Sequence, residues 1–151
     1  LTREYLNPMH WEVNKSVLSA PYNLLQAASG FMFGSLSFSD RFRSQRILQI
    51  GMGGGAISNY LAAMPVNLSI DVVELEPTVY DVAKRFFNLT ENERVKVKIE
   101  DGVKFVERAA IRNFAYDAIL LDACDNSPRN PIPCPTGVFR DPQVIENLSK
   151  V

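Results

Sequence analysis

The sequence of 151 residues predicts an α/β fold, a Rossmann-like doubly wound parallel sheet covered by helices. From residue 45 onward, short strand-like runs and helically spaced segments take turns four times. Parallel neighbours need a crossover, which a helix between successive strands supplies. The glycine-rich stretch GMGGG at 51–55 lies directly between the first strand and the first of these helices. In open α/β sheets this turn is a usual place for a ligand.

Each element has its own local signal. The β-branched run 68–75 and the alternating run 95–99 are typical of strands, and the continuous apolar run 116–122 is typical of a strand buried on both faces. Pro77 stands at a favoured first-turn position of a helix. The predicted strands are 47–50, 68–75, 95–99 and 116–122, and the predicted helices between them are 56–64, 77–87 and 102–114.

The two ends differ from this alternation. Residues 1–45 are predicted to form an N-terminal helical lead-in, with a helix over 19–33 that has Ser19 as its cap and Pro21 in its first turn. Residues 46–151 are predicted to form the nucleoside-binding α/β core of four βα units. Four prolines in 126–137 predict a surface loop, which leads into a helix over 138–151.

Composition and charge exclude several classes of protein. A net charge of -1 and the absence of a long apolar run predict no nucleic-acid partner and no membrane span, and we expect a cytoplasmic protein.

Cys124 and Cys134 form neither a C-x-x-C nor a metal pattern, so two reduced thiols and no metal site are expected. His10 is the only histidine, which excludes a histidine-based triad or a multi-histidine metal site. Trp11 and Tyr22 fit either a core or a pocket wall.

The glycines and the second strand end indicate a nucleoside site. Gly51, Gly53 and Gly55 let a ligand lie directly against the backbone at a helix N-terminus. Glu74 ends the second strand, where a carboxylate can accept hydrogen bonds from both hydroxyls of a ribose. Glu76 is the competing acid, but its place beside a helix start favours a solvated role.

The third and fourth strands also end in acids. Asp101 can accept from the exocyclic amine of adenine, and Gly102 beside it leaves room for a flat ring. Asp122 and Asp125 follow the fourth strand, at the point where the strand order of the sheet would switch, and meet the reacting end of the ligand. Each acid alone fits a helix cap or a solvated carboxylate equally well, and it is their shared position after a glycine loop that indicates a site.

These segments resemble a known family. ILQIGMGGG, VVELEP, IEDGVKF and YDAILLDACD are similar to the class I S-adenosylmethionine-binding domain, in its spermidine synthase-like branch, over residues 45–150. The resemblance implies a cofactor, S-adenosylmethionine or its decarboxylated form, and a set of contacts. It implies Gly51, Gly53 and Gly55 at the amino-acid part, Glu74 at the ribose, and Asp101 and Gly102 at the adenine. It also implies Leu75 as a further cofactor contact, Asp122 as both a cofactor contact and the proton acceptor, and Asp125 at the amine substrate.

The sequence also departs from polyamine synthases. They carry an aspartate in the glycine loop and D-S-S-D-P where this chain has DACDN, so methyl transfer to an amine acceptor, which can be a protein, is the preferred function. Aminopropyl transfer to a polyamine and a non-catalytic binding or dimerisation domain are the alternatives. A nicotinamide enzyme would use Gly51, Gly53 and Ala56, but it gives no role to Asp101 and Gly102.

The class I domain implied by the resemblance continues with three more strands. We therefore expect this chain to be truncated after the fourth strand and its helix. The apolar run 118–121 would then lie at a sheet edge, which predicts either a longer natural protein or a homodimer.

Overall fold

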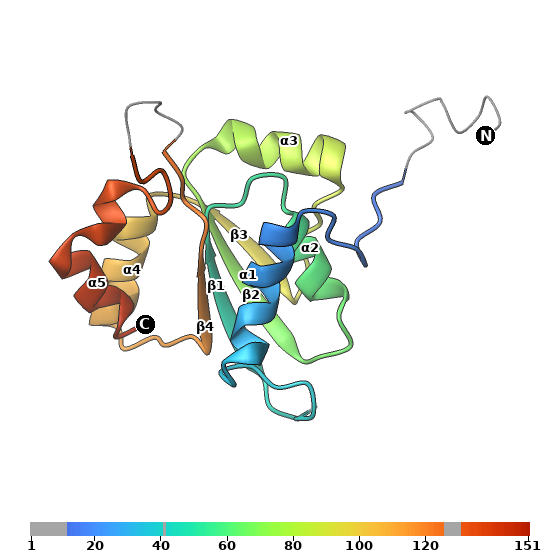
Figure 1. Cartoon of the computed structure of the whole chain (residues 1–151), viewed down its shortest axis with the longest axis horizontal. Coiled ribbons are helices and arrows are strands. Elements are labelled where there is room, and N and C mark those ends of the chain that lie inside the picture. Colours follow the sequence, from blue (N-terminus) through green and yellow to red (C-terminus); the bar gives the residue numbers. More distant parts are fainter. Residues whose placement is uncertain (1–11, 41, 126–130) are drawn as a thin grey trace.

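The computed structural model describes residues 12–40, 42–125 and 131–151 and shows a parallel sheet between two layers of helices (Figure 1). The strands are β1 (Gln45–Ile50), β2 (Leu68–Glu74), β3 (Val95–Ile99) and β4 (Ala118–Leu121). Their order is β3-β2-β1-β4, and every pair is parallel. The order reverses at β1, which confirms the predicted doubly wound sheet.

Helices cover both faces of the sheet, as Figure 1 shows. One face packs against α1 (Pro21–Met32), α2 (Ala56–Ala63) and α3 (Pro77–Phe87). The other face packs against α4 (Gly102–Ile111), the 3₁₀ turn η3 (Gly137–Arg140) and α5 (Pro142–Leu148). Since α1 contacts both α2 and β4, it belongs to the same packed unit, and the division of the chain at residue 45 stays a prediction.

The strand register brings all four carboxyl ends to one edge. Ile50 is level with Val73 of β2 and with Leu121 of β4, and Glu74 is level with Ile99 of β3. The residues that follow each strand therefore gather on that edge, which is where the sequence predicted the site.

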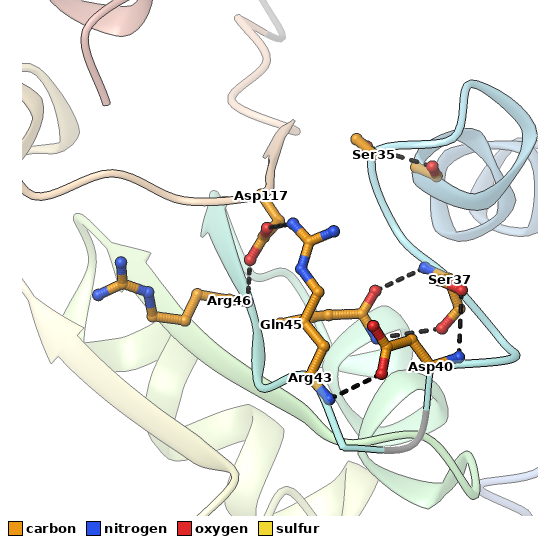
Figure 2. Close-up of polar contacts among 8 residues, drawn as sticks. Ser35, Ser37, Asp40, Arg43, Gln45, Arg46 and Asp117 are labelled. Atoms are coloured by element: carbon orange, nitrogen blue, oxygen red, sulfur yellow. Dashed lines mark hydrogen bonds and ion pairs between the residues drawn. The ribbon is translucent and has the colours of Figure 1, made fainter.

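Polar contacts fix the opposite edge, shown in Figure 2. The side chain of Gln45 accepts from the backbone N–H of Ser37 and donates to its carbonyl (2.5 and 3.0 Å). Asp117 pairs with Arg43 and accepts from the backbone N–H of Arg46 at 2.7 Å. The segment between α1 and β1 is thereby attached to the start of both β1 and β4.

Two predicted helix ends were wrong by several residues. The helix predicted over 102–114 ends at Ile111, because Asn113 adopts a left-handed conformation with φ of 52° and the N–H of Phe114 turns back to the carbonyl of Ala109. The helix predicted over 138–151 is two pieces. Pro142 keeps Asp141 extended (ψ 133°), so η3 ends there and α5 begins anew.

The predicted cap of the first helix was also wrong. The N-cap of α1 is Ala20, without a side-chain hydrogen bond, and not Ser19. Pro21 opens the helix as expected.

The expectation of two reduced thiols is contradicted, because Cys124 and Cys134 form a disulfide with their Cα atoms 4.5 Å apart. The chain after β4 pairs with the segment that returns: the N–H of Asp125 donates to the carbonyl of Pro133, and that of Thr136 to Ala123 (both 2.8 Å). This pairing brings the two cysteines together although ten positions separate them. The predicted proline-rich loop falls partly on 126–130, outside the described residues.

Candidate functional site

A cavity of about 710 Å³ lies at the carboxyl ends of the strands. Its walls come from the β1–α2 loop, the ends of β2, β3 and β4, the start of α4, and η3. Seven predicted site residues line it, namely Gly51, Gly53, Glu74, Leu75, Asp101, Gly102 and Asp122, while Gly55 and Asp125 do not. His10 and Trp11 lie outside the described residues.

The glycine loop has separate requirements at each position. Gly51 has φ of 83°, and a Cβ there would lie 2.3 Å from the carbonyl oxygen of Asp122, so only glycine lets β1 and β4 end this close together. Gly53 has φ of 53° and open space where its Cβ would be. Gly55 is the N-cap of α2, also at positive φ, and packs against Leu89. Gly51 and Gly53 thus line the cavity, whereas Gly55 shapes the start of the helix.

Buried polar side chains hold this loop in place. Gln49, 1% exposed, donates to the carbonyl of Gly51 at 3.0 Å and accepts from the hydroxyl of Ser58 at 2.7 Å. The N–H of Met52 donates to Oε2 of Glu74 at 2.9 Å. The loop is therefore tied to its own strand, to α2 and to β2.

Glu74 is 8% exposed at the wall of the cavity. Its Oε1 accepts from the N–H of Glu76 and its Oε2 from that of Met52, both at 2.9 Å. Each carboxylate oxygen has a second lone pair, so the side chain can still accept hydrogen bonds from a ligand. Leu75 is exposed beside it, and Glu76 precedes α3 without capping it through its side chain.

The two residues predicted at the third strand end, Asp101 and Gly102, both have structural roles. Oδ1 of Asp101 accepts from the N–H of Val103 at 2.8 Å, which makes Asp101 the N-cap of α4 as well as a wall of the cavity. A Cβ on Gly102 would lie 2.7 Å from Ile50 and 3.1 Å from Phe139. The space beside Gly102 is occupied by protein side chains, so Gly102 is needed for packing between α4, β1 and η3.

Asp122 is half-buried, and burial raises the pKa of its carboxyl. The hydroxyl of Tyr22, on α1, donates to its Oδ1. Asp125 lies beyond the wall of the cavity, in the strand-like pairing with Pro133. The geometry therefore joins Tyr22, not Asp125, to Asp122.

The charged residues of the cavity are mostly acidic. Of the residues that the structure describes, Glu74, Glu76, Asp101 and Asp122 contribute carboxylates to the wall, and Lys104 is the one cation. The rest of the wall is largely apolar, with Val79, Val138 and Phe139 among its members. A positively charged nucleoside suits such a cavity, whereas the phosphates of a dinucleotide do not.

Sequence reasoning missed part of the wall. Thr136, Val138 and Phe139 reach the cavity only because the disulfide-bonded segment folds back over the strand ends. Tyr22 precedes Asp122 by 100 positions, and its aromatic character gave only a choice between core and pocket wall. No local pattern in the sequence indicates either arrangement.

The strand order, glycine loop and acidic strand ends define an α/β domain of the Rossmann-like methyltransferase fold. The chain belongs to the spermine/spermidine synthase domain family, which matches residues 31–148. The solved structure of human methyltransferase-like protein 13 in complex with SAH is similar, with a TM-score of 0.65 at 23% identity, covering 85% of this chain and 56% of that chain.

One curated relative is named as a methyltransferase and another as an aminopropyltransferase. The eEF1A lysine and N-terminal methyltransferase of Xenopus laevis is 32% identical over 106 residues, covering 70% of this chain and 15% of the relative. The polyamine aminopropyltransferase of Vibrio vulnificus is 36% identical over 81 residues, covering 54% of this chain and 27% of the relative. The chain therefore spans a minor part of the length of either relative.

Among the described residues, no helix is long and apolar enough to cross a bilayer. No group of three or more histidine, cysteine or acidic side chains within those same ranges could hold a metal ion.

Proposed function

We propose that this chain is the S-adenosylmethionine-binding part of a methyltransferase that acts on an amine acceptor. The observation that carries the proposal is the acidic cavity at the strand ends. It combines Gly53, which has open space at its Cβ position, with the carboxylate of Glu74 on β2 and the half-buried Asp122 after β4. The cofactor, when bound, supplies a methyl group activated by an adjacent sulfonium. The described wall carries four carboxylates and one ammonium, and this balance favours the sulfonium cation.

Each cavity residue has a proposed task. Glu74 accepts hydrogen bonds from the ribose hydroxyls through the lone pairs that its backbone partners leave available. Asp101 receives the exocyclic amine of adenine on the oxygen that does not cap α4. Gly53 lets the amino-acid part of the cofactor lie against the backbone, since nothing occupies the space of its missing side chain.

Asp122 is the proposed proton acceptor for the attacking amine. Its raised pKa makes it a stronger base than an exposed aspartate, because burial disfavours its charged form. The hydroxyl of Tyr22 fixes the orientation of the carboxylate. Asp125 is proposed as a secondary contact to the acceptor from beyond the cavity wall.

The acceptor and the form of the cofactor rest on different observations. The glycine loop carries Met52 and no acid among its glycines, which favours the carboxylated cofactor and methyl transfer. The Xenopus laevis relative, named for lysine and N-terminal methylation of eEF1A, supports a protein amine as the acceptor. The Vibrio vulnificus relative supports the second candidate, aminopropyl transfer from the decarboxylated form.

A ligand panel tests the proposal by thermal shift. S-adenosylmethionine, its decarboxylated form, methylthioadenosine and NAD are compared at one common concentration, and a ligand present at about 100 times its dissociation constant stabilises the chain by about 2.7 kcal/mol. We expect the first and third to stabilise the chain by several degrees. A preference for the decarboxylated form favours the polyamine alternative, NAD alone overturns the nucleoside site, and no shift at all favours a binding domain.

Two glycines provide a matched pair of variants for this panel. Gly53 and Gly34 both have positive φ (53° and 78°) and open space at the Cβ position, but only Gly53 lines the cavity. Alanine at either position costs about 1–2 kcal/mol in the left-handed conformation. We expect only Gly53→Ala to weaken binding of S-adenosylmethionine by tenfold or more (about 1.4 kcal/mol). Equal loss of affinity in both variants would contradict the placement of the cofactor.

The cytoplasmic location remains part of the proposal. The Cys124–Cys134 disulfide is more typical of an oxidising compartment. Trapping free thiols in the cell before isolation tests the point, and two blocked thiols per chain are the result expected for the cytoplasm.

A further inference from the structure

A second cavity of about 290 Å³ lies on the face of the sheet that α4 covers. Three cationic side chains line it, Lys98, Arg108 and Arg112, together with three aromatic rings, Phe105, Phe114 and Tyr116. The first turn of α4 lines the large cavity, and Phe105, Arg108 and Ala109 of the same helix line this one. The proposed methyl transfer does not use any of these residues.

The cations of this cavity are only partly neutralised. Arg108 pairs with Glu100, and Nζ of Lys98 lies 3.7 Å from a carboxylate oxygen of Asp71. Within the described part of the chain, no carboxylate pairs with the guanidinium of Arg112 or with that of Arg46. Two guanidinium groups are therefore available near one small cavity.

Arg46 belongs to this region through its position over a ring. Its backbone N–H is bonded to Asp117, but its side chain extends away from that network, as Figure 2 shows. Its Cζ lies 4.4 Å from the centroid of the Phe114 ring. Phe114 thus carries one arginine on its face and contributes to the wall of the cavity.

The rings are held in fixed positions. Phe114 and Tyr116 meet edge to face, with centroids 5.2 Å apart, and Nζ of Lys98 lies 4.7 Å from the centroid of Phe105. The hydroxyl of Tyr116 donates to Asp71 at 2.7 Å. Burial and this hydrogen bond raise the pKa of Tyr116, so its ring adds no negative charge at neutral pH.

We propose that this cavity binds a small planar organic anion, a single ring that carries a carboxylate or a phosphate. The guanidinium of Arg112 forms the paired hydrogen bonds that either acid group accepts. The rings of Phe105 and Phe114 pack against the flat part of the ligand. A volume near the lower limit of small-molecule pockets fits one ring and excludes a dinucleotide.

Nuclear magnetic resonance on the ¹⁵N-labelled chain tests the proposal with four probes. Phenyl phosphate and benzoate are the two anions, benzyl alcohol is the uncharged ring, and inorganic phosphate is the anion without a ring. We expect both aromatic anions to shift the amides of 112–116 at concentrations up to about 10 mM. Whichever of the two binds more tightly identifies the acid group. We expect benzyl alcohol and inorganic phosphate to bind at least about tenfold more weakly, because each lacks one of the two interactions.

Two variants separate the site from general surface charge. Arg112→Gln should weaken the aromatic anions by at least about tenfold, while Arg85→Gln, on the exposed last turn of α3, should not change their affinity. Arg112→Lys keeps the charge if the glutamine variant fails to fold, and it should lose part of the affinity because the paired geometry is lost.

Several results would overturn the proposal. These are no shift with either aromatic anion, equal affinity in Arg112→Gln and the parent chain, equal binding of benzyl alcohol, or shifts confined to the glycine loop at 51–55. Methylthioadenosine provides the control for separate cavities. If the amide shifts that it causes remain while phenyl phosphate is added, the two ligands occupy different cavities, whether or not the proposed methyl transfer is correct.

Discussion

Glu74 has two tasks that compete for one carboxylate. It accepts the N–H groups of Met52 and Glu76, which fixes the glycine loop on β2, and it is the proposed acceptor for the ribose hydroxyls in the cavity that it lines. Removing the side chain therefore affects the fold as well as binding. A ligand that binds here benefits from a loop already held in position.

Substitution of Glu74 separates these two tasks. Glu74→Ala leaves two backbone donors without their partner and should destabilise the chain by about 1–3 kcal/mol for each donor that stays buried. Glu74→Gln keeps one acceptor oxygen, so it should unfold less easily than the alanine variant, yet it should bind methylthioadenosine at least about tenfold more weakly. Urea denaturation and calorimetry measure the two effects. Unchanged affinity in Glu74→Gln would remove the carboxylate from the ribose site.

Asp122 gives a pH dependence whose sign follows from its environment. Burial raises the pKa of this carboxyl in the folded chain, so its ionisation costs more free energy in the folded chain than in the unfolded chain. The stability of the chain therefore falls as pH rises from the ordinary aspartate range through the raised pKa. Asparagine cannot ionise, and its side-chain oxygen can still accept from Tyr22.

We expect Asp122→Asn to have a higher melting temperature than the parent at pH 7 and no such advantage at pH 3. The gain should be about 1–2 °C, because the side chain is only half-buried and water screens its charge. Glu93→Gln, at an exposed position outside both cavities, is the control and should show no comparable trend. Parallel melting curves for Asp122→Asn and the parent across this pH range would be evidence against a buried acid.

At the scale of residues, the sequence could place the acids but not their surroundings. Glu74, Asp101 and Asp122 end or follow strands, and the ends of parallel strands meet at one edge, so position alone predicted their convergence. Asp125 follows only three positions after Asp122, but the paired segment that carries the disulfide takes it out of the cavity wall. Such an arrangement depends on a contact with residues about ten positions away, which spacing cannot reveal.

Helix α4 connects stability to the site through its cap. Asp101 caps α4 through Val103, and Asp141 caps α5 through Gln143 in the same way (2.8 and 2.9 Å). Only Asp101 lines the large cavity. The two residues therefore form a pair in which capping is shared and contact with the ligand is not.

We expect Asp101→Ala and Asp141→Ala each to lose about 1 kcal/mol of stability, the usual cost of removing an N-cap. Only Asp101→Ala should also weaken methylthioadenosine. Asp101→Ser keeps a capping oxygen without a second acceptor, so it should restore most of the stability and little of the affinity. Chemical denaturation and calorimetry on the same samples check both. If the serine variant recovers full affinity, Asp101 acts on the ligand only through the helix.

At the scale of elements, the existence and order of the strands and helices followed from the sequence, whereas several ends did not. The 2- and 3.6-residue periods and the glycine loop were sufficient for the sheet. The end of α4 depends on Asn113 in a left-handed conformation, and the break before α5 depends on how Pro142 restricts Asp141. Both residues were visible in the sequence, but the helical spacing on either side concealed their effect.

The described strands leave one apolar edge unpaired. β4 pairs with β1 on one side, and no described strand pairs with it on the other. Exposed backbone groups on such an edge favour pairing with another chain. We therefore expect the 151-residue chain to self-associate, with a sedimentation coefficient that rises with concentration and slower amide exchange in 118–121. A monomer at all concentrations, with rapid exchange in those residues, would contradict this interface.

The charge distribution of the whole molecule gives a final expectation about the cofactor. The chain has a net charge of -1, yet its large cavity gathers four carboxylates against Lys104. This local field attracts a cation, and salt screens it over roughly 10 Å at 0.1 M. S-adenosylmethionine carries a sulfonium, whereas S-adenosylhomocysteine has the same nucleoside and amino-acid parts with an uncharged sulfur.

We expect affinity for the sulfonium form to fall several-fold more than affinity for the thioether form between about 0.05 and 0.5 M salt, since only the former loses a net attraction. Calorimetry on both ligands measures the difference directly. Lys104→Gln should strengthen binding of the sulfonium form further, because it removes the one opposing charge that the described residues place on the wall. Identical salt slopes for the two ligands would show that the carboxylates act only through short hydrogen bonds.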